Sequence, residues 1–252
     1  MEGYFLTDRG KIRAHNEDSG GLFYNTDDQL IAIIADGMGG HQAGDVASQL
    51  ATKLMKQKWQ TTDRVNAPDK AEVWLSDTIS DVNQSIYEHS LQNKECEGMG
   101  TTIVAAICTD EFLTIAHVGD SRGYLLNENG FKQVTEDHSL VNELLRSGQI
   151  SEQDAEWHPR KNIILKAVGT EETVSEDILT VEWEAGDKLL LCSDGLSDKL
   201  SEQEMAAYLT ATGDLKETGL EMIRLANERG GEDNITLILL QHGSSLEAGE
   251  DE

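Results

Sequence analysis

The apolar run at residues 31–35 constrains this chain most, because it leads directly into Asp36 and a cluster of glycines. An unbroken apolar run rich in β-branched residues predicts a strand that is buried on both faces. A carboxylate at the end of such a strand is costly to bury unless a positive charge meets it. Glycines beside it let the backbone turn sharply and approach an ion or a phosphate closely. Taken alone, an aspartate at the end of a strand is more often a turn residue or a helix N-cap than part of a binding site.

The same pattern recurs along the chain, with acidic residues at the ends of other predicted strands. These are Glu17 and Asp18 near the N-terminus, Asp120 after residues 112–118, Asp194 after residues 188–192, and Asp233 before residues 235–240. Carboxylates that gather in an apolar setting cannot all ionise unless cations neutralise them. Ligands that are oxygen only, with no cysteine or paired histidine nearby, favour Mg²⁺ or Mn²⁺ over zinc. The sequence therefore predicts a divalent-metal site where these strand ends meet.

Composition narrows the function classes. The net charge of −27 argues against nucleic acid or an anionic membrane as a partner. No stretch approaches the roughly 18 apolar residues of a membrane span, and the N-terminus lacks a signal-peptide pattern, so a cytoplasmic protein is expected. Three cysteines, Cys96, Cys108 and Cys192, form no disulfide framework. Cys192 precedes Asp194 closely, but no basic neighbour in the sequence would lower its pKa for a nucleophilic role.

The periodic patterns predict strands, two helices, strands, two helices and a last strand. Mostly antiparallel strands with segregated helices indicate an α+β fold. We predict a four-layer α-β-β-α sandwich, in which two sheets pack face to face and a helix pair lies outside each. The first helix pair is expected at residues 43–57 and 69–92, with Asp69 and Glu72 as a capping pattern. The strands between residues 100 and 134 are expected to form an antiparallel meander.

One domain is expected over residues 1–242. Residues 139–162 carry the most basic short run of an acidic chain and little apolar pattern, which predicts a flap that leaves the core. Residues 243–252 are rich in acidic residues and have no apolar period, which predicts a disordered tail.

Seven short motifs follow one another over nearly the whole chain. They are Thr7-Asp8-Arg9-Gly10 to Asn16-Glu17-Asp18, Asp36-Gly37-Met38-Gly39-Gly40, Gly100-Thr101-Thr102, Val118-Gly119-Asp120-Ser121-Arg122, Asp137-His138-Ser139, Ser193-Asp194-Gly195-Leu196 and Gly231-Glu232-Asp233-Asn234-Ile235-Thr236. Together, and in this order, they resemble the metal-dependent serine/threonine protein phosphatases of the PP2C-like (PPM) family, specifically its compact bacterial members. Each motif is weak alone, whereas seven in order are a specific signal.

The resemblance implies a role for each acidic residue. Asp36 would bridge two metal ions, and the Gly37 carbonyl would bind one of them. Glu17 would ligate the second ion, whereas Asp194 and Asp233 would ligate the first. Asp18 would hold metal-bound water, and Asp120 would support, with Asp194, a possible third ion.

The resemblance also implies roles for the remaining site residues. Arg13 would bind the substrate phosphate, and Asn234 would orient Asp233 or a water molecule. Animal members carry a histidine directly after the Asp-Gly pair, proposed as general acid, where this chain has Met38. His41, three residues further on, could protonate the leaving alkoxide, or it could simply pack within the loop.

The predicted function is a cytoplasmic phosphatase of phosphoserine and phosphothreonine proteins. It would use two Mn²⁺ or Mg²⁺ ions, with a third possible, act as a monomer and reverse the work of a cognate serine/threonine kinase. A catalytically weak module that binds phosphoproteins is one alternative, although its acidic set should then have lost a ligand. A phosphatase of small phosphoesters is another, and an open cleft would count against it.

Overall fold

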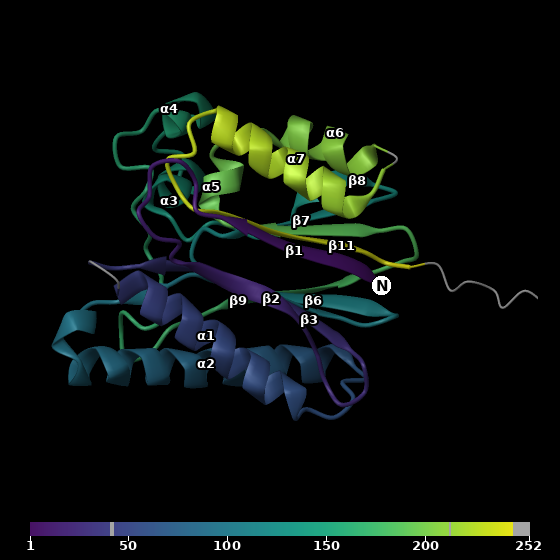
Figure 1. Cartoon of the computed structure of the whole chain (residues 1–252), viewed down its shortest axis with the longest axis horizontal. Coiled ribbons are helices and arrows are strands. Elements are labelled where there is room, and N and C mark those ends of the chain that lie inside the picture. Colours follow the sequence, from purple (N-terminus) through teal and green to yellow (C-terminus); the bar gives the residue numbers. More distant parts are fainter. Residues whose placement is uncertain (41–42, 212, 244–252) are drawn as a thin grey trace, which may run out of the picture.

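The computed structural model describes residues 1–40, 43–211 and 213–243, and it has four layers (Figure 1). One sheet has the strand order β1-β11-β10-β7-β8, and the other has the order β2-β3-β5-β6-β9. Helices α6 and α7 cover the first sheet, and α1 and α2 cover the second (Figure 1). The predicted α+β sandwich of two antiparallel sheets with a helix pair outside each is therefore confirmed.

The strand bounds of the first sheet are β1 (Glu2–Asp8), β11 (Ile235–Gln241), β10 (Lys188–Cys192), β7 (Arg122–Asn127) and β8 (Gly130–Gln133). Those of the second are β2 (Asp18–Tyr24), β3 (Leu30–Met38), β5 (Ile103–Cys108), β6 (Phe112–Val118) and β9 (Asp177–Glu182), with β4 (Gly100–Thr101) paired to the end of β3. The outer helices are α1 (Ala43–Gln60), α2 (Pro68–Gln92), α6 (Glu202–Thr210) and α7 (Leu215–Glu228).

Strand β3 is buried on both faces, as its apolar run predicts. Ile31 and Ile33 pack toward α1 and α2, while Ala32 and Ile34 pack into the core between the two sheets, and all four are fully buried. Complete burial of one such large apolar side chain stabilises the fold by about 1.5–3 kcal/mol. The strand continues through Asp36 to Met38, because β4 pairs with Gly37 and Met38. Asp36 is thus fixed within a strand and not in a loop behind it.

The predicted meander between residues 100 and 134 is wrong. Strands β5 and β6 pair in one sheet and β7 and β8 pair in the other, so the chain crosses between sheets at residues 119–121. Gly119 has a φ of +105°, a conformation that favours glycine. The crossing places Asp120 at one end of the sandwich, between the two sheets.

The cap expected for the second helix is also wrong. Helix α2 begins one residue earlier, at Pro68, with Ala67 as N-cap and no side-chain cap bond. Proline suits the first helical position, because the N–H it lacks would have no partner inside the helix. At the start of α6, by contrast, Ser201 and Glu204 form a capping box, and both of its reciprocal hydrogen bonds are present.

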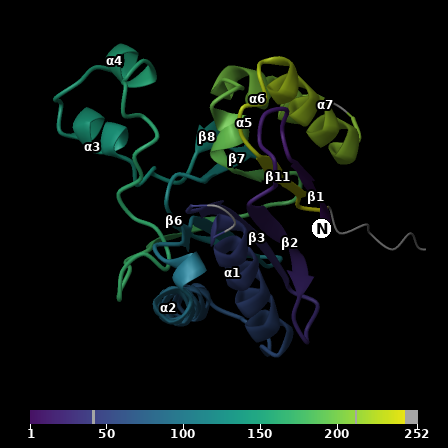
Figure 2. The ribbon, with the colours of Figure 1, turned by 60° about the vertical axis from the view of Figure 1, so that its left-hand side comes forward.

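The segment predicted as a flap stands away from the sandwich (Figure 2). It carries α3 (Leu140–Arg146), in which no residue is buried, and α4 (Glu152–Glu156). Its two ends lie side by side, since the Leu140 N–H donates to the Ile163 carbonyl and the Leu165 N–H donates to the His138 carbonyl, at 2.9 and 2.7 Å. We call these paired ends, residues 138–140 and 163–165, the stem.

Most of the predicted acidic tail, residues 244–252, lies outside the described residues. Within the ranges that the structure covers, no helix combines the length and the apolar character needed to cross a bilayer.

Candidate metal centre

The N-terminal half of the acidic cluster is built by the pairing of β2 with β3. Asp18 lies directly opposite Asp36 in this ladder. The Glu17 carbonyl accepts hydrogen bonds from the Gly37 N–H at 3.1 Å and from the Ser48 hydroxyl at 2.5 Å. Backbone pairing alone therefore gathers Glu17, Asp18, Asp36 and Gly37 at one end of the sandwich.

Gly37 cannot be replaced without moving the backbone around it. A Cβ at this position would lie 2.1 Å from the Gly44 carbonyl oxygen and 2.6 Å from the Glu17 carbonyl oxygen. The first turn of α1 therefore packs directly on the strand that carries Asp36. Thr101 and Thr102 fix Asp36 from the other side, because the Thr101 hydroxyl donates to its carbonyl and the Thr102 hydroxyl accepts from its N–H.

The C-terminal half comes from the other sheet. Asp194 is the first residue of α5 (Asp194–Ser197), directly after β10, and Asp233 lies in the loop before β11. A hydrogen bond of 2.9 Å from the Ser193 hydroxyl to Asp18 Oδ2 joins the two halves. A Cβ on Gly195 would lie 1.9 Å from the Asn234 carbonyl oxygen, so α5 and this loop are also in direct contact.

Asn234 holds the loop that carries Glu17. Its Oδ1 accepts from the Glu17 N–H at 2.8 Å, and its Nδ2 donates to the Arg9 and His15 carbonyls at 2.9 and 3.0 Å. Its hydrogen bond to the Asp233 carboxylate comes from the backbone and not the side chain: the Asn234 N–H donates to Asp233 Oδ1 at 2.8 Å. The side chain thus positions Glu17, whereas the sequence assigned it to Asp233 or a water molecule.

Arg13 is half-exposed and extends from the same loop toward the cluster. Its Nη2 donates to Asp233 Oδ2 at 2.7 Å. A guanidinium has five N–H donors in a planar fork, so one bond to Asp233 leaves others for a second anion.

Burial and mutual repulsion make these carboxylates hard to ionise. Burial raises the pKa of Asp18 and of Asp120 to about 6. Burial also raises the pKa of Asp36 and Asp194 well above the ordinary aspartate value, and in both cases the neighbouring aspartates raise it further. The pKa of Glu17 is raised, again mainly by burial. Such a group of carboxylates is stable as anions only when cations neutralise it.

The donor set fits hard divalent cations. Among the residues that the structure describes, Oδ1 of Asp18, Oδ1 of Asp120 and Oδ1 of Asp194 are buried without a hydrogen-bond partner. Native proteins rarely leave buried polar atoms unpaired. Several carboxylate oxygens in one place, with no sulfur or imidazole among them, are the ligands that Mg²⁺ and Mn²⁺ prefer.

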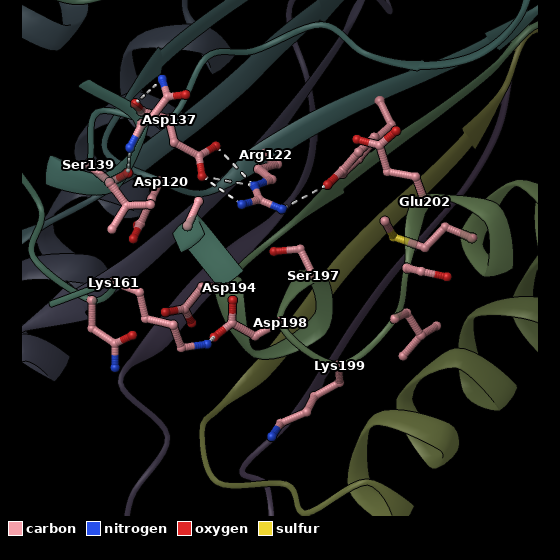
Figure 3. Close-up of a pocket in the computed structure, with 18 of the residues that line it drawn as sticks. Asp120, Arg122, Asp137, Ser139, Lys161, Asp194, Ser197, Asp198, Lys199 and Glu202 are labelled. Atoms are coloured by element: carbon pink, nitrogen blue, oxygen red, sulfur yellow. Dashed lines mark hydrogen bonds and ion pairs between the residues drawn. The ribbon is translucent and has the colours of Figure 1, made fainter. Parts of the chain in front are cut away.

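The segment predicted as a flap, residues 139–162, is called the projecting segment below. A cleft of about 670 Å³ opens beside Asp120 and Asp194 and runs beneath this segment. Figure 3 shows Arg122 forked onto Asp137 on one wall and Lys161 paired with Asp198 on the other. The Arg122–Asp137 pair is largely buried, with contacts of 2.9 Å from Nε to Oδ1 and 2.7 Å from Nη2 to Oδ2. The Lys161–Asp198 pair, at 2.6 Å, connects the projecting segment to the residue that follows α5.

A second group with metal-ligating side chains, His117, His138 and Asp177, does not suit an ion. The Lys166 ammonium lies 3.5 Å from Asp177 Oδ1, so this carboxylate already has a cation. The two imidazole rings are stacked at an angle of 13°, so their in-plane lone pairs do not converge on one point.

All of the predicted site residues within the described ranges thus lie together in the structure. His41 lies outside those ranges. The sequence missed the hydroxyls of Ser193 and Thr102 that bond Asp18 and Asp36. The available signal was their place in the seven motifs, Ser193 directly before Asp194 and Thr102 in Gly100-Thr101-Thr102. It also missed Asp198, whose charge raises the pKa of both Asp120 and Asp194.

Comparison with known proteins agrees with this geometry. A model of the protein phosphatase 2C family matches residues 11–236. The serine/threonine phosphatase stp of Listeria monocytogenes is 51% identical over 241 residues, which cover 96% of each chain. The crystal structure of Stp1 from Staphylococcus aureus has a TM-score of 0.91 at 39% identity and covers 96% of this chain and 95% of its own.

The catalytic domain of the phosphatase PstP, solved with two manganese ions, has a TM-score of 0.84 at 33% identity, with 96% of this chain and 98% of that one covered. The chain belongs to the protein phosphatase 2C family. The predicted enzyme class, protein-serine/threonine phosphatase, is thereby confirmed.

Proposed function

We propose that this phosphatase hydrolyses phosphoserine and phosphothreonine in proteins at the acidic cluster, with two Mn²⁺ or Mg²⁺ ions. Asp36 would lie between the ions and Gly37 would offer its carbonyl to one of them. Glu17 would ligate one ion, Asp194 and Asp233 the other, and Asp18 would hold water. The observation that carries the proposal is the set of buried carboxylate oxygens on Asp18, Asp120 and Asp194 that have no protein partner among the described residues.

Bound divalent ions supply an activated water for in-line attack and offset the charge on the transferring phosphoryl group. The chain's own residues orient the reactants. Asn234 holds the Glu17 backbone, and Thr101 and Thr102 hold the Asp36 backbone. Arg13 would turn its free N–H groups to the phosphate while it keeps its bond to Asp233, because a guanidinium matches two phosphate oxygens at once. His41 is proposed, on sequence alone, to protonate the leaving alkoxide.

Asp120 and Asp194 are proposed to support a third ion. Both line the wide cleft, and both have a buried Oδ1 without a partner in the described part of the chain. The two manganese ions in the PstP structure support the type of ion and a count of at least two.

The substrate enters, on this proposal, along the cleft beneath the projecting segment, and a cognate serine/threonine kinase supplies the phosphoprotein. A cytoplasmic location is supported by three buried free cysteines. The net charge of −27 supports a partner other than nucleic acid or an anionic membrane. The enzyme is proposed to act as a monomer.

The test is hydrolysis of a phosphothreonine peptide with EDTA, with Mg²⁺ and with Mn²⁺. Asp36→Asn should lower kcat by at least about 100-fold, since loss of a residue that only supports a metal ligand already costs 10–100-fold. Asp81→Asn, which removes a carboxylate from the surface pair with Lys58, is the matched control and should retain full activity. A folded wild type that is inactive with either ion would overturn the proposal and favour the phosphoprotein-binding alternative.

A further inference from the structure

His138 holds Gly119 by both of the glycine's backbone polar groups. The Gly119 N–H donates to His138 Nδ1 at 3.1 Å, and the His138 N–H donates to the Gly119 carbonyl at 2.9 Å. Gly119 precedes Asp120 directly, at the point where the chain crosses between the sheets. This pair of bonds therefore fixes the peptide plane from which the Asp120 side chain departs.

The position of Gly119 leaves little room for another arrangement. A Cβ on Gly119 would lie 2.6 Å from Thr102 Cγ2, and its φ of +105° disfavours any other residue. Beyond Asp120, the Ser121 hydroxyl is hydrogen-bonded to the Thr102 hydroxyl at 2.7 Å. The Asp120 carboxylate, by contrast, has a buried Oδ1 with no hydrogen-bond partner among residues 1–40, 43–211 and 213–243. Contacts to the residues on either side therefore help to decide where Asp120 points.

The other edge of the His138 ring is held as well. Because a backbone N–H donates to Nδ1, the ring proton resides on Nε2, which lies 3.3 Å from Asp177 Oδ1. Asp177 is the first residue of β9 and pairs with His117 of β6, and the His117 ring stacks on His138 at a centroid distance of 4.8 Å. The ring is therefore fixed in orientation by strands of the second sheet.

We propose that His138 is a positioning residue for Asp120, which orients this carboxylate toward Asp194 so that both can hold the third ion. The inference rests on the metal role of Asp120 in the proposed function. On this proposal His138 would touch neither the substrate nor an ion. It acts through Gly119, and it is also the first residue of the stem, whose carbonyl accepts the Leu165 N–H at 2.7 Å. One residue thus connects the root of the projecting segment to a metal-facing carboxylate.

Three variants separate positioning from general stability. His138→Leu removes the acceptor for the Gly119 N–H. His138→Asn retains it, because the Asn Oδ1 occupies nearly the same position as the imidazole Nδ1. His242→Leu removes a buried histidine located after the end of β11 that is remote from Asp233, and is the control.

The measurement is calorimetric titration of the metal-free protein with Mn²⁺, beside thermal melting. It is read at the proposed third-ion site, which has the fewest proposed protein ligands, Asp120 and Asp194, and is therefore expected to be the weakest. His138→Leu should weaken that site about 10–100-fold, the usual cost of losing a partner that orients a metal ligand. The tighter sites should be unchanged, and His138→Asn should stay within about threefold of wild type. Asp120→Asn should lose the weak site, and adding His138→Leu should weaken binding no further, as residues that act through one another are non-additive.

The inference would be overturned if His138→Leu bound Mn²⁺ as wild type does. It would also be overturned if His138→Leu and His138→Asn lost the same affinity at the weakest site. Weakening of all sites in His138→Leu, or the same loss in His242→Leu, would also overturn it, because either result indicates a general loss of stability. If His138→Leu does not fold, Asp177→Leu is the substitute: it removes the partner of His138 Nε2, and with it that of Lys166, but leaves the bond from Gly119 to Nδ1 in place. It should weaken the same site about threefold to tenfold, and binding as in wild type would overturn the inference. Peptide hydrolysis is measured separately. An inactive wild type would then count against the proposed function, whereas the metal titration alone decides the role of His138.

Discussion

The two sides of the acidic cluster are built differently. On one side, Glu17, Asp18 and Asp36 belong to or adjoin paired strands. The backbone of each is fixed by hydrogen bonds to neighbouring segments of the same chain. On the other, Asp120 and Asp194 line the cleft together with residues of the projecting segment. Figure 2 shows how far this segment stands away from the sandwich. This segment contributes Lys161 to the cleft, and no residue of its helix α3 is buried.

The difference separates the rigid from the adaptable part of the enzyme. Strand pairing and buried apolar side chains hold the acidic cluster, so its carboxylates stay together despite their repulsion. The projecting segment buries little surface, and regions with few buried apolar contacts open most easily. Chemistry is therefore expected to depend on the first side and the choice of substrate on the second.

The largest effect should come from Asp194→Asn, which removes one of the crowded charges. Activity should fall by at least about 100-fold. The metal-free variant, however, should be more stable than metal-free wild type at pH 8, by about 1–3 kcal/mol, because burial and neighbouring aspartates oppose ionisation of Asp194. Melting temperature measured in EDTA tests this, and a lower value for the variant would contradict it.

A pH series should reveal the same repulsion among the carboxylates without any substitution at Glu17, Asp18 or Asp36. The pKa of Asp120 is about 6 in the folded protein, above roughly 3.9 in an unfolded chain. The folded state therefore binds the extra proton, and this stabilisation is complete below about pH 4 and is lost as the pH rises through about 6.

The lowered pKa of His138 makes stability rise with pH in this range, which is opposite to the effect of Asp120. The contribution of Asp120 is therefore isolated by comparing wild type with Asp120→Asn, because both proteins retain His138. In EDTA, the stability of wild type relative to Asp120→Asn should fall by about 1–3 kcal/mol between pH 5 and pH 8. With Mn²⁺ the trend should reverse, since binding requires deprotonated ligands. Parallel pH profiles for the two proteins in EDTA would show that Asp120 is not perturbed.

Asn234→Ala should have the next largest effect on stability. It leaves the Glu17 N–H and the carbonyls of Arg9 and His15 without their side-chain partner. The free energy of unfolding should fall by about 1–3 kcal/mol, and activity should fall with it. Asn129→Ala, in the exposed turn between β7 and β8, is the control in urea denaturation and should change neither quantity.

The smallest effect should come from Lys161→Met, on the adaptable side. The ion pair with Asp198 is partly exposed on both sides, and such surface pairs contribute about 0–1 kcal/mol. The melting temperature should therefore barely change. A loss of stability as large as that of Asn234→Ala would mean that the projecting segment is an integral part of the core.

The sequence predicted the layers and the acidic cluster because each depends on local pattern. The apolar run of β3 and the repeated acid-beside-glycine motif needed no knowledge of distant contacts. The crossing at Gly119 was missed, because alternating strands look the same whether they pair within one sheet or cross to another. The bonds of Asn234 were missed because they join residues more than 200 positions apart, which no local pattern can reveal.

The stem has a consequence for how this enzyme can diversify. Its two ends are paired to each other, so the chain between them is a closed loop whose span is fixed independently of its content. Doubling the length of such a loop costs only about 0.6 kcal/mol in closure entropy. The intervening residues can therefore be exchanged as a cassette, which would alter substrate preference while the chemistry at the strand ends is inherited intact.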